Sequence, residues 1–317
     1  MKTSFYFLPL ALLCSFWSGS ACGQANLVVT TPVTATPGAF NTILGLSSGG
    51  SLTAASNRNL FAAFAAGQNS TTAARNVFLG IDAGQFNTTG ADNVFVGYRA
   101  GLKNTLASQN VFVGTDARQL NTTGTNNVFI GYQAGLNNTF GSNNTFAGFD
   151  AGNNNTTGLQ NTYFGKKAGF QNSTSPANSF YGSESGANNT GRTNSFFGNV
   201  SGFSNTVGNS NCFFGNNTGL NNTTGDKNTF FGSYSGQTNI TGAFNTVLGA
   251  DANVGSAALN NATAIGYLAR VSVSHAVALG NPDDLTLKVG IGTDSPELRW
   301  AIAIRSSNSQ APGTDLG

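Results

Sequence analysis

Residues that could carry chemistry are few in this chain, and they lie far apart. A histidine can act as a general base, but His275 is the only histidine and precedes an expected strand at a loop position, which favours a solvated loop residue. No nucleophile, base and orienting group can be assembled from the remaining polar residues. We therefore expect a protein that is not an enzyme and that uses no cofactor.

Carboxylates could bind calcium if they recurred regularly. Calcium-binding β-rolls place an Asp in nearly every nine-residue repeat, whereas only seven carboxylates are spread over the 13 repeats of this chain: Asp82, Asp92, Asp116, Asp150, Glu184, Asp226 and Asp251. We expect no metal site. The Lys166–Lys167 pair is interpreted as a solvated turn, and the scattered Lys and Arg residues argue against a nucleic-acid surface.

The composition is polar without being charged. Only 8% of the 317 residues are Asp, Glu, Lys or Arg, and the net charge is +2, but the chain contains 25 Phe and 42 Gly. Sparse charge together with many aromatic residues argues against disorder. The side chains that could position a site must therefore belong to a folded framework made of Asn, Thr, Ser, Gly and Phe.

That framework is an internal repeat, and its period determines the fold. The pattern Asn-x-Phe-apolar-Gly occurs in 13 copies, in steps of 17 residues except for a first step of 18 and one of 16. Two looser copies end at Gly266 and Gly280. The 13 copies begin at Asn41, Asn59, Asn76, Asn93, Asn110, Asn127, Asn144, Asn161, Asn178, Asn194, Asn211, Asn228 and Asn245.

Each copy contains a short run of aromatic and β-branched residues, which favours a strand. A helix is excluded, because no stretch between glycines is long enough and each helical Gly costs about 1 kcal/mol. The run supplies two apolar ladders. We assign the core ladder to Phe78, Phe95, Phe112, Phe129, Phe146, Phe180, Phe196, Phe213 and Phe230, with Tyr163 in the same slot. The second ladder comprises Leu79, Val96, Val113, Ile130, Phe164, Phe197, Phe214, Phe231 and Leu248.

Glycines mark the corners of each copy, because glycine accepts a positive φ without steric cost. The first corner falls at Gly80, Gly97, Gly114, Gly131, Gly148 and Gly165. A small residue such as Ala83 and a second Gly follow. The sequence Asn-Thr-Thr-Gly, as at residues 87–90, predicts a further turn, and residues such as Asn121, Asn155 and Asn222 are expected to stack in hydrogen-bonding ladders.

Seventeen residues cannot bury a core alone, so the copies must stack as rungs of a parallel β-solenoid. At about 4.8 Å a rung, 13 to 15 rungs form a rod about 60–70 Å long. Adjacent strand residues point to opposite faces, so the interior can hold only one apolar ladder. The other would form a stripe larger than soluble monomers usually expose. We therefore expect a homo-oligomer packed along its axis.

The segment NATAIGYLARVSVSHAVALGN, residues 261–281, resembles the head repeats of trimeric autotransporter adhesins, the YadA-like β-roll. The 17-residue copies resemble an elongated variant of that rung. The resemblance implies a left-handed roll, a homotrimer and adhesion to a surface. In addition, VGIGTDSPEL (residues 289–298) resembles the junction before the chaperone modules of phage tail fibres and endosialidases, although only 19 residues follow Leu298.

The amino terminus resembles a secretory signal peptide, with Lys2, an apolar run and then small residues. Cleavage after Ala21 would leave Cys22 first, as in a lipoprotein, but Gly19 stands where a lipobox has Leu, which favours simple cleavage. Of the three cysteines, Cys14 lies in the signal and Cys212 stands alone in the repeats, so they provide no disulfide framework. The predicted organisation is a signal peptide at 1–25, a lead-in at 26–40, 17-residue repeats at 41–260, YadA-like repeats at 261–281 and a junction with a C-terminal tail at 282–317.

These observations predict a secreted or cell-surface fibre, associated with the outer membrane, that adheres to a surface, glycan or matrix. A fragment of a phage-type tail fibre is the alternative. Ice binding through a Thr ladder is more remote, because solenoid ice binders use a flat Thr-x-Thr strand, whereas Asn-Thr-Thr-Gly places adjacent threonines on opposite sides of a turn.

Overall fold

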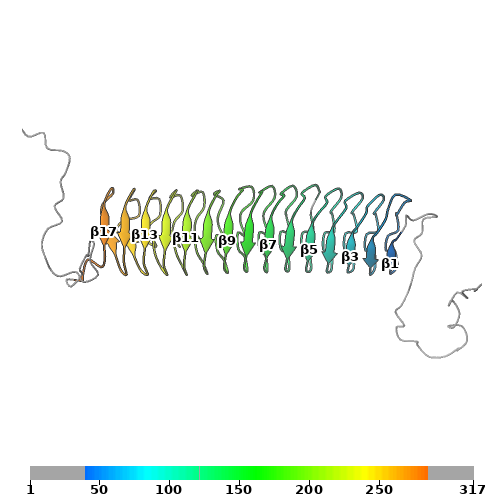
Figure 1. Cartoon of the computed structure of the whole chain (residues 1–317), viewed down its shortest axis with the longest axis horizontal. Helices are drawn as coiled ribbons and strands as arrows, with labels where there is room; N and C mark the ends of the chain where they lie inside the picture. The colour runs from blue at the N-terminus through cyan, green and yellow to red at the C-terminus, as the bar shows by residue number, and fades with distance from the viewer. Residues whose placement is uncertain (1–39, 121, 285–317) are drawn as a thin grey trace, which may run out of the picture.

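The chain forms a straight rod of stacked turns, seen in a computed structural model that describes residues 40–120 and 122–284 (Figure 1). Fifteen of its strands pair in a single parallel sheet, and successive strands follow one another along the rod. The described residues contain strands, turns and bends but no helix. The prediction of an all-β parallel solenoid with about 17 residues per rung is confirmed.

Each rung contributes one three-residue strand to this sheet. The strands are β1 (Thr42–Leu44), β2 (Leu60–Ala62), β3 (Val77–Leu79), β4 (Val94–Val96), β5 (Val111–Val113), β6 (Val128–Ile130), β7 (Thr145–Ala147), β8 (Thr162–Phe164), β9 (Ser179–Tyr181), β10 (Ser195–Phe197), β11 (Cys212–Phe214), β12 (Thr229–Phe231), β13 (Thr246–Leu248), β15 (Thr263–Ile265) and β17 (Val277–Leu279). A second sheet pairs β14 (Asn253–Val254) with β16 (Arg270–Val271).

Equivalent residues of neighbouring rungs lie in register. Phe129 in β6 pairs with Phe112 below and Phe146 above. Backbone hydrogen bonds join the rungs on both sides, since the Val128 amide donates to the Asn144 carbonyl at 2.9 Å and the Gly131 amide donates to the Val113 carbonyl at 2.8 Å. The fixed 17-residue step keeps each residue type above its equivalent.

The irregular 16-residue step does not disturb this register. Phe180 in β9 still pairs with Phe196 in β10. The missing residue is absorbed in the turn after the buried Asn, because the Asn189 side chain donates to the carbonyl of Gly191, two residues on. In the next rung the equivalent Asn205 donates to Gly208, three residues on. The turn, rather than the strand, absorbs changes in repeat length.

The strands end at the predicted corner glycines, where the backbone turns with a positive φ. Gly97 has a φ of 133°, and a Cβ placed on it would lie 2.6 Å from the Gly114 carbonyl oxygen. Neighbouring rungs approach too closely here for any side chain. The corner therefore favours glycine for two reasons, its φ and its contact with the next rung, although the second rung has Ala63 there with a φ of 116°.

Two further positions in each rung have a positive φ but are not glycine. Asp82 (φ 58°) and Arg99 (φ 55°) represent one, two residues after the corner glycine, while Arg75 (φ 56°) and Asp92 (φ 60°) represent the other, just before the buried Asn. A left-handed conformation costs a non-Gly residue about 1–2 kcal/mol. Stacking between rungs therefore holds these residues in a backbone conformation that is unfavourable for them in isolation.

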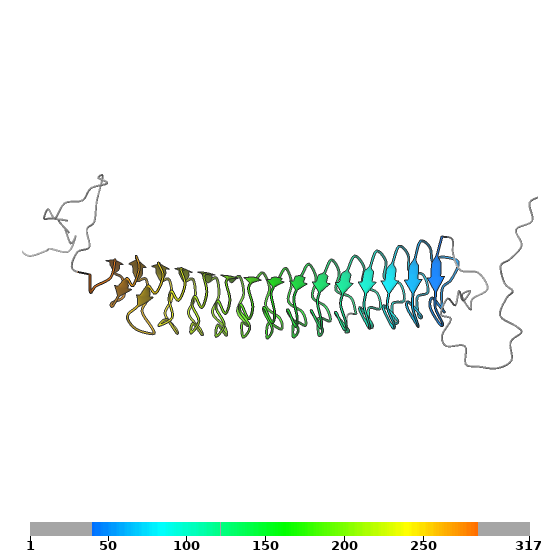
Figure 2. The same ribbon diagram turned by 90° about the horizontal axis from the view of Figure 1, so that it is seen from below.

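The sheet twists about the rod axis. In Figure 2 the strands at the blue end face the viewer, whereas those at the orange end lie along the upper edge. This is the gradual rotation expected of stacked strands. The second sheet, β14 with β16, lies towards the C-terminal end, where the rung shortens to the 14-residue spacing between β15 and β17.

Candidate functional site

The interior of the rod is a continuous stack of aromatic rings. Every member of the predicted core ladder has an exposed fraction of 0%, as does Tyr163. Ring centroids of successive rungs from Phe61 to Phe230 lie 4.6–5.3 Å apart, in near-parallel planes. This spacing matches the distance between strands, so the rings stack because the backbone places them one rung apart.

Two ladders of buried Asn side chains accompany the rings. In the first, Asn127 accepts from the Asn144 amide at 3.0 Å and donates to the Gly141 carbonyl, also at 3.0 Å. In the second, the Asn155 amide donates to Asn138 at 3.3 Å, and Asn222 donates to Asn205 at 2.7 Å. The predicted Asn121 lies outside the described residues. These amides satisfy backbone groups inside the rod and are not available to a ligand.

The second predicted ladder lies outside. We call it the strand column, and it consists of the third residue of each strand, which directly precedes the corner position. Its exposed fraction reaches 45% at Ile130 and 58% at Phe231. Leu44, Phe164, Tyr181, Phe214, Ile265 and Leu279 are also exposed, and the other members are partly buried. It comprises Leu44, Ala62, Leu79, Val96, Val113, Ile130, Ala147, Phe164, Tyr181, Phe197, Phe214, Phe231, Leu248, Ile265 and Leu279.

A second exposed column begins just past the corner glycine, and the sequence analysis missed it. We call it the corner column: Leu46, Phe64, Ile81, Tyr98, Thr115, Tyr132, Phe149, Lys166, Ser183, Asn199, Asn216, Ser233, Ala250, Tyr267 and Asn281. Leu46, Phe64, Ile81, Tyr98, Tyr132 and Phe149 are all exposed. Aligning the repeats could have predicted this column, because a large apolar residue stands at this position in most of the early rungs.

Together the strand column and the corner column form one stripe along the rod, which we call the apolar stripe, although its corner column is polar from Lys166 to Ser233. Lys166 is its only charged member. Its exposed rings also stack, since Phe197 and Phe214 have centroids 4.2 Å apart and Tyr132 and Phe149 have centroids 5.2 Å apart. Stacked rings present their edges to solvent, not their faces, so this surface suits packing against another sheet face.

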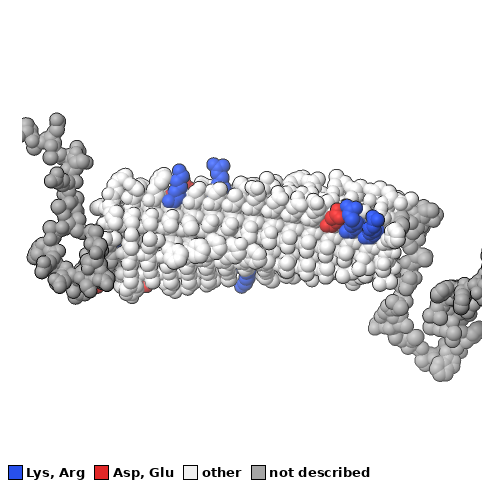
Figure 3. All heavy atoms as spheres, viewed as in Figure 1, with Lys and Arg blue, Asp and Glu red and all other residues white. Residues whose placement is uncertain are grey.

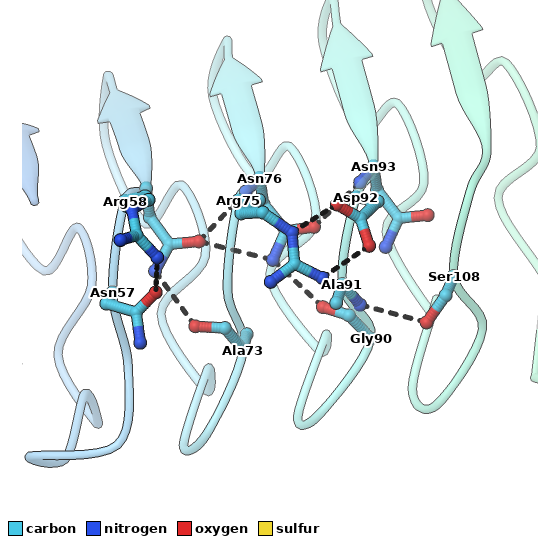
Figure 4. A network of polar contacts seen from close by, with 11 residues as sticks. Asn57, Arg58, Ala73, Arg75, Asn76, Gly90, Ala91, Asp92, Asn93 and Ser108 are labelled. Atoms are coloured by element: carbon cyan, nitrogen blue, oxygen red, sulfur yellow. Dashed lines mark hydrogen bonds and ion pairs between the residues drawn. The ribbon is translucent and has the colours of Figure 1, made fainter.

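Charged side chains are sparse on the rod (Figure 3). Near the N-terminal end, Arg75 and Asp92 form an ion pair between successive rungs, with the Arg75 Nε donating to Asp92 at 2.5 Å (Figure 4). The hydrogen bond from Arg75 lowers the pKa of Asp92. Both groups are largely exposed, so the pair adds little stability. Figure 4 also shows the buried amides of Asn76 and Asn93 beside it.

Arg118 is the one charged residue among those the structure describes that is fully buried. It occupies the position where neighbouring rungs have Gly101 and Gly135, with a φ of 47°. Its Nε donates to the Asn138 carbonyl at 3.1 Å, and its guanidinium lies 5.2 Å from the Phe112 centroid. Burial holds the pKa of Arg118 well below its usual value. The sequence analysis overlooked this departure from the repeat.

The remaining candidate residues do not come together. His275 is exposed, and its Nδ1 lies 3.2 Å from the Asn261 side-chain amide. Among residues 40–120 and 122–284, no group of three or more His, Cys, Asp or Glu side chains could hold a metal ion. Cys212 is a free thiol in β11, and burial raises its pKa. These groups are therefore separate from one another on the rod.

The threonines of the Asn-Thr-Thr-Gly turn form a half-buried column and an exposed one. Thr88, in the half-buried column, donates its hydroxyl to the Thr105 carbonyl of the next rung at 2.9 Å. The exposed column contains Thr89 and Thr157 but is interrupted by Leu106, Phe140 and Val207. A regular outward array of free hydroxyl groups is therefore not built on this side.

Comparison with known protein families and with curated proteins finds no match to this chain. Among the described residues, no helix is long and apolar enough to cross a membrane. The segment resembling a signal peptide and the segment VGIGTDSPEL both lie outside the described residues.

Proposed function

We propose that this protein is a non-enzymatic fibre, exported to the cell surface or secreted, that self-associates through its apolar stripe and adheres to a surface, glycan or matrix. The observation that carries the proposal is the stripe itself, which follows the whole length of a rod that carries little charge elsewhere. Most soluble monomers do not leave such a surface exposed.

The area of the stripe is adequate for a stable contact between copies. A rod of 15 rungs is about 70 Å long, and two columns of side chains are about 10 Å wide, which gives about 700 Å² on each copy. A standard stable interface buries about 800 Å² on each partner. The resemblance to YadA-like head repeats supports a trimer, and it also supports adhesion as the role of the assembled fibre.

Adhesion can be tested with the mature protein attached to beads. We expect these beads to be retained on at least one coated surface, either a glycan array or a set of extracellular matrix proteins, more strongly than beads coated with an unrelated protein of similar charge. Retention equal to that control on every surface would overturn the adhesive part of the proposal and leave a purely structural fibre.

A further inference from the structure

The first residue of each strand forms a third outward-facing column, and its chemistry changes part-way along the rod. It lies two residues before the strand column, on the same face of the sheet. In β3 to β6 this residue is a valine, whereas from β7 to β15 the main sheet has threonine or serine in every rung except that of Cys212. We call the hydroxyl-bearing residues the hydroxyl column: Thr145, Thr162, Ser179, Ser195, Thr229, Thr246 and Thr263.

The hydroxyl groups of this column are free to bind a ligand. All seven residues are exposed or partly exposed, and among the described residues none of these hydroxyl groups donates or accepts a hydrogen bond. The half-buried turn threonines differ, since the Thr223 hydroxyl donates to the Ile240 carbonyl at 3.1 Å. Strand pairing holds the hydroxyl column in register, because Thr145 pairs with Thr162 and Thr162 pairs with Ser179. Free hydroxyl groups therefore recur at the spacing of one rung.

A second column of exposed side chains accompanies the hydroxyl column, two residues before it in each rung. We call it the polar column: Asn143, Gln160, Ala177, Thr193, Ser210, Lys227, Phe244 and Asn261. All eight residues are exposed and most are polar. Side chains at this position reach from rung to rung, since the Thr193 and Ser210 hydroxyl groups lie 2.9 Å apart. Figure 4 shows Arg75 and Asp92 meeting in the same way nearer the N-terminal end. Lys227 is the only charged residue in the two columns.

This chemistry suits a ligand that is rich in hydroxyl groups and carries no charge. Hydroxyl and amide side chains both donate and accept hydrogen bonds, as sugar hydroxyl groups do. A nucleic acid or an acidic glycan would require many cations on the protein. A surface that repeats at every rung offers equivalent contacts along its length, so it fits a polymer of repeating units better than a folded protein.

Resting on the adhesive role proposed above, we infer that the hydroxyl column and the polar column bind a neutral polysaccharide whose extended chain lies along the rod. Neither column is part of the apolar stripe, so self-association and sugar binding use different side chains. The sheet rotates gradually about the rod axis (Figure 2), and a flexible chain can follow this rotation, whereas a flat crystal face such as ice could not contact every rung. Each hydrogen bond is weak alone, but contacts along one polymer chain act together.

Biolayer interferometry with the mature full chain tests the inference. Glucomannan and xyloglucan, two neutral polysaccharides with extended chains, are immobilised on separate sensors, and alginate, which is acidic, on a third. We expect the protein to bind at least one of the neutral polysaccharides and to bind alginate more weakly. The variant that combines Thr162→Val, Thr229→Val and Thr246→Val should bind about tenfold more weakly, because three hydrogen bonds are lost.

A matched control separates the hydroxyl column from hydroxyl groups elsewhere on the rod. It combines Thr157→Val, Thr224→Val and Thr241→Val, which removes three exposed hydroxyl groups from the turns. We expect its affinity to equal that of the unmodified chain. Both variants should keep the circular dichroism of the rod, and β3 to β6 already carry valine at the position of the hydroxyl column. Equal affinities of the two triple variants would overturn the inference.

Two further outcomes would also contradict the inference, and they separate it from the proposed function. Stronger binding to alginate than to both neutral polysaccharides would overturn the class of ligand. Retention on extracellular matrix proteins without binding to either neutral polysaccharide would overturn the inference and leave adhesion intact. If the protein binds none of these surfaces, the adhesive part of the proposed function fails, and the inference fails with it.

Discussion

At the scale of single residues, Arg118 is the position where a charged side chain is buried among the described residues. Neighbouring rungs have glycine there, and a Cβ on Gly101 would lie 2.6 Å from the Phe95 ring. Around Arg118 the stack is correspondingly wider, since Phe112 and Phe129 have centroids 5.3 Å apart and ring planes inclined by 15°. The Leu120 amide reaches the next rung at 3.4 Å, compared with 2.9 Å for Phe86.

Arg118→Gly is therefore expected to stabilise the rod. Desolvating a cation costs several kcal/mol, and the hydrogen bond to the Asn138 carbonyl and the contact with the rings offset part of this cost. We therefore expect a net gain of about 1 kcal/mol. Thermal melts monitored by circular dichroism measure the change. Arg99→Gly is the control, because Arg99 has a similar φ of 55° but is only partly buried, and its replacement should change stability little. A lower melting temperature for Arg118→Gly would show that its contacts outweigh its desolvation.

The buried Asn side-chain amides also contribute to the stability of the rod. Asn127→Ala removes the acceptor of the Asn144 amide and leaves that buried backbone group unsatisfied, whereas the Gly141 carbonyl keeps the Asn138 side chain as a donor. We expect a loss of about 1–3 kcal/mol, the usual cost of one such group. Asn126→Gly is the control: it keeps the left-handed backbone (φ 58°) and removes only an exposed side chain. Equal melting temperatures for the two variants would argue against the amide ladder.

At the scale of elements, each rung depends on the corner that ends its strand. Gly97→Ala would place a Cβ 2.6 Å from the Gly114 carbonyl, at a φ of 133°. We expect a loss of several kcal/mol, beyond the roughly 1 kcal/mol of unfavourable conformation alone, measured by chemical denaturation. Gly50→Ala should be tolerated, because its nearest neighbour would be 3.5 Å away and its φ is ordinary. Similar midpoints for both variants would mean that the corner has room to relax.

The element scale also shows how much could be predicted from sequence. The repeat step predicts the rungs, and glycine at Gly97 predicts the corner, because glycine adopts a positive φ at the lowest cost. Strand alternation alone could not decide whether Phe129 or Ile130 faces inward, since both are apolar. The left-handed backbone at Asp82 and Arg75 was not predictable, because stacking imposes it on residues of no characteristic type. The second sheet, β14 with β16, depends on contacts between rungs that the local sequence does not record.

At the scale of the whole molecule, the apolar residues inside the rod and those on the apolar stripe have different roles. Substitutions at two adjacent residues, Phe129 and Ile130, test these roles separately. Phe129→Asp should destabilise the rung, because it buries an unpaired charge in the ring stack. Ile130→Asp should leave the folded rod intact but dissociate the assembly, because Ile130 is 45% exposed on the stripe. Circular dichroism and sedimentation distinguish the two effects. Persistence of the Ile130→Asp oligomer would place the interface on another face.

The central claim is that the apolar stripe is buried by contact with other copies of the chain. The most direct measurement is the mass of the mature native protein by light scattering over a wide range of concentration. The account predicts an integer multiple of the chain mass, with three copies favoured by the resemblance to YadA-like heads. A single well-dissolved chain at high concentration would contradict it.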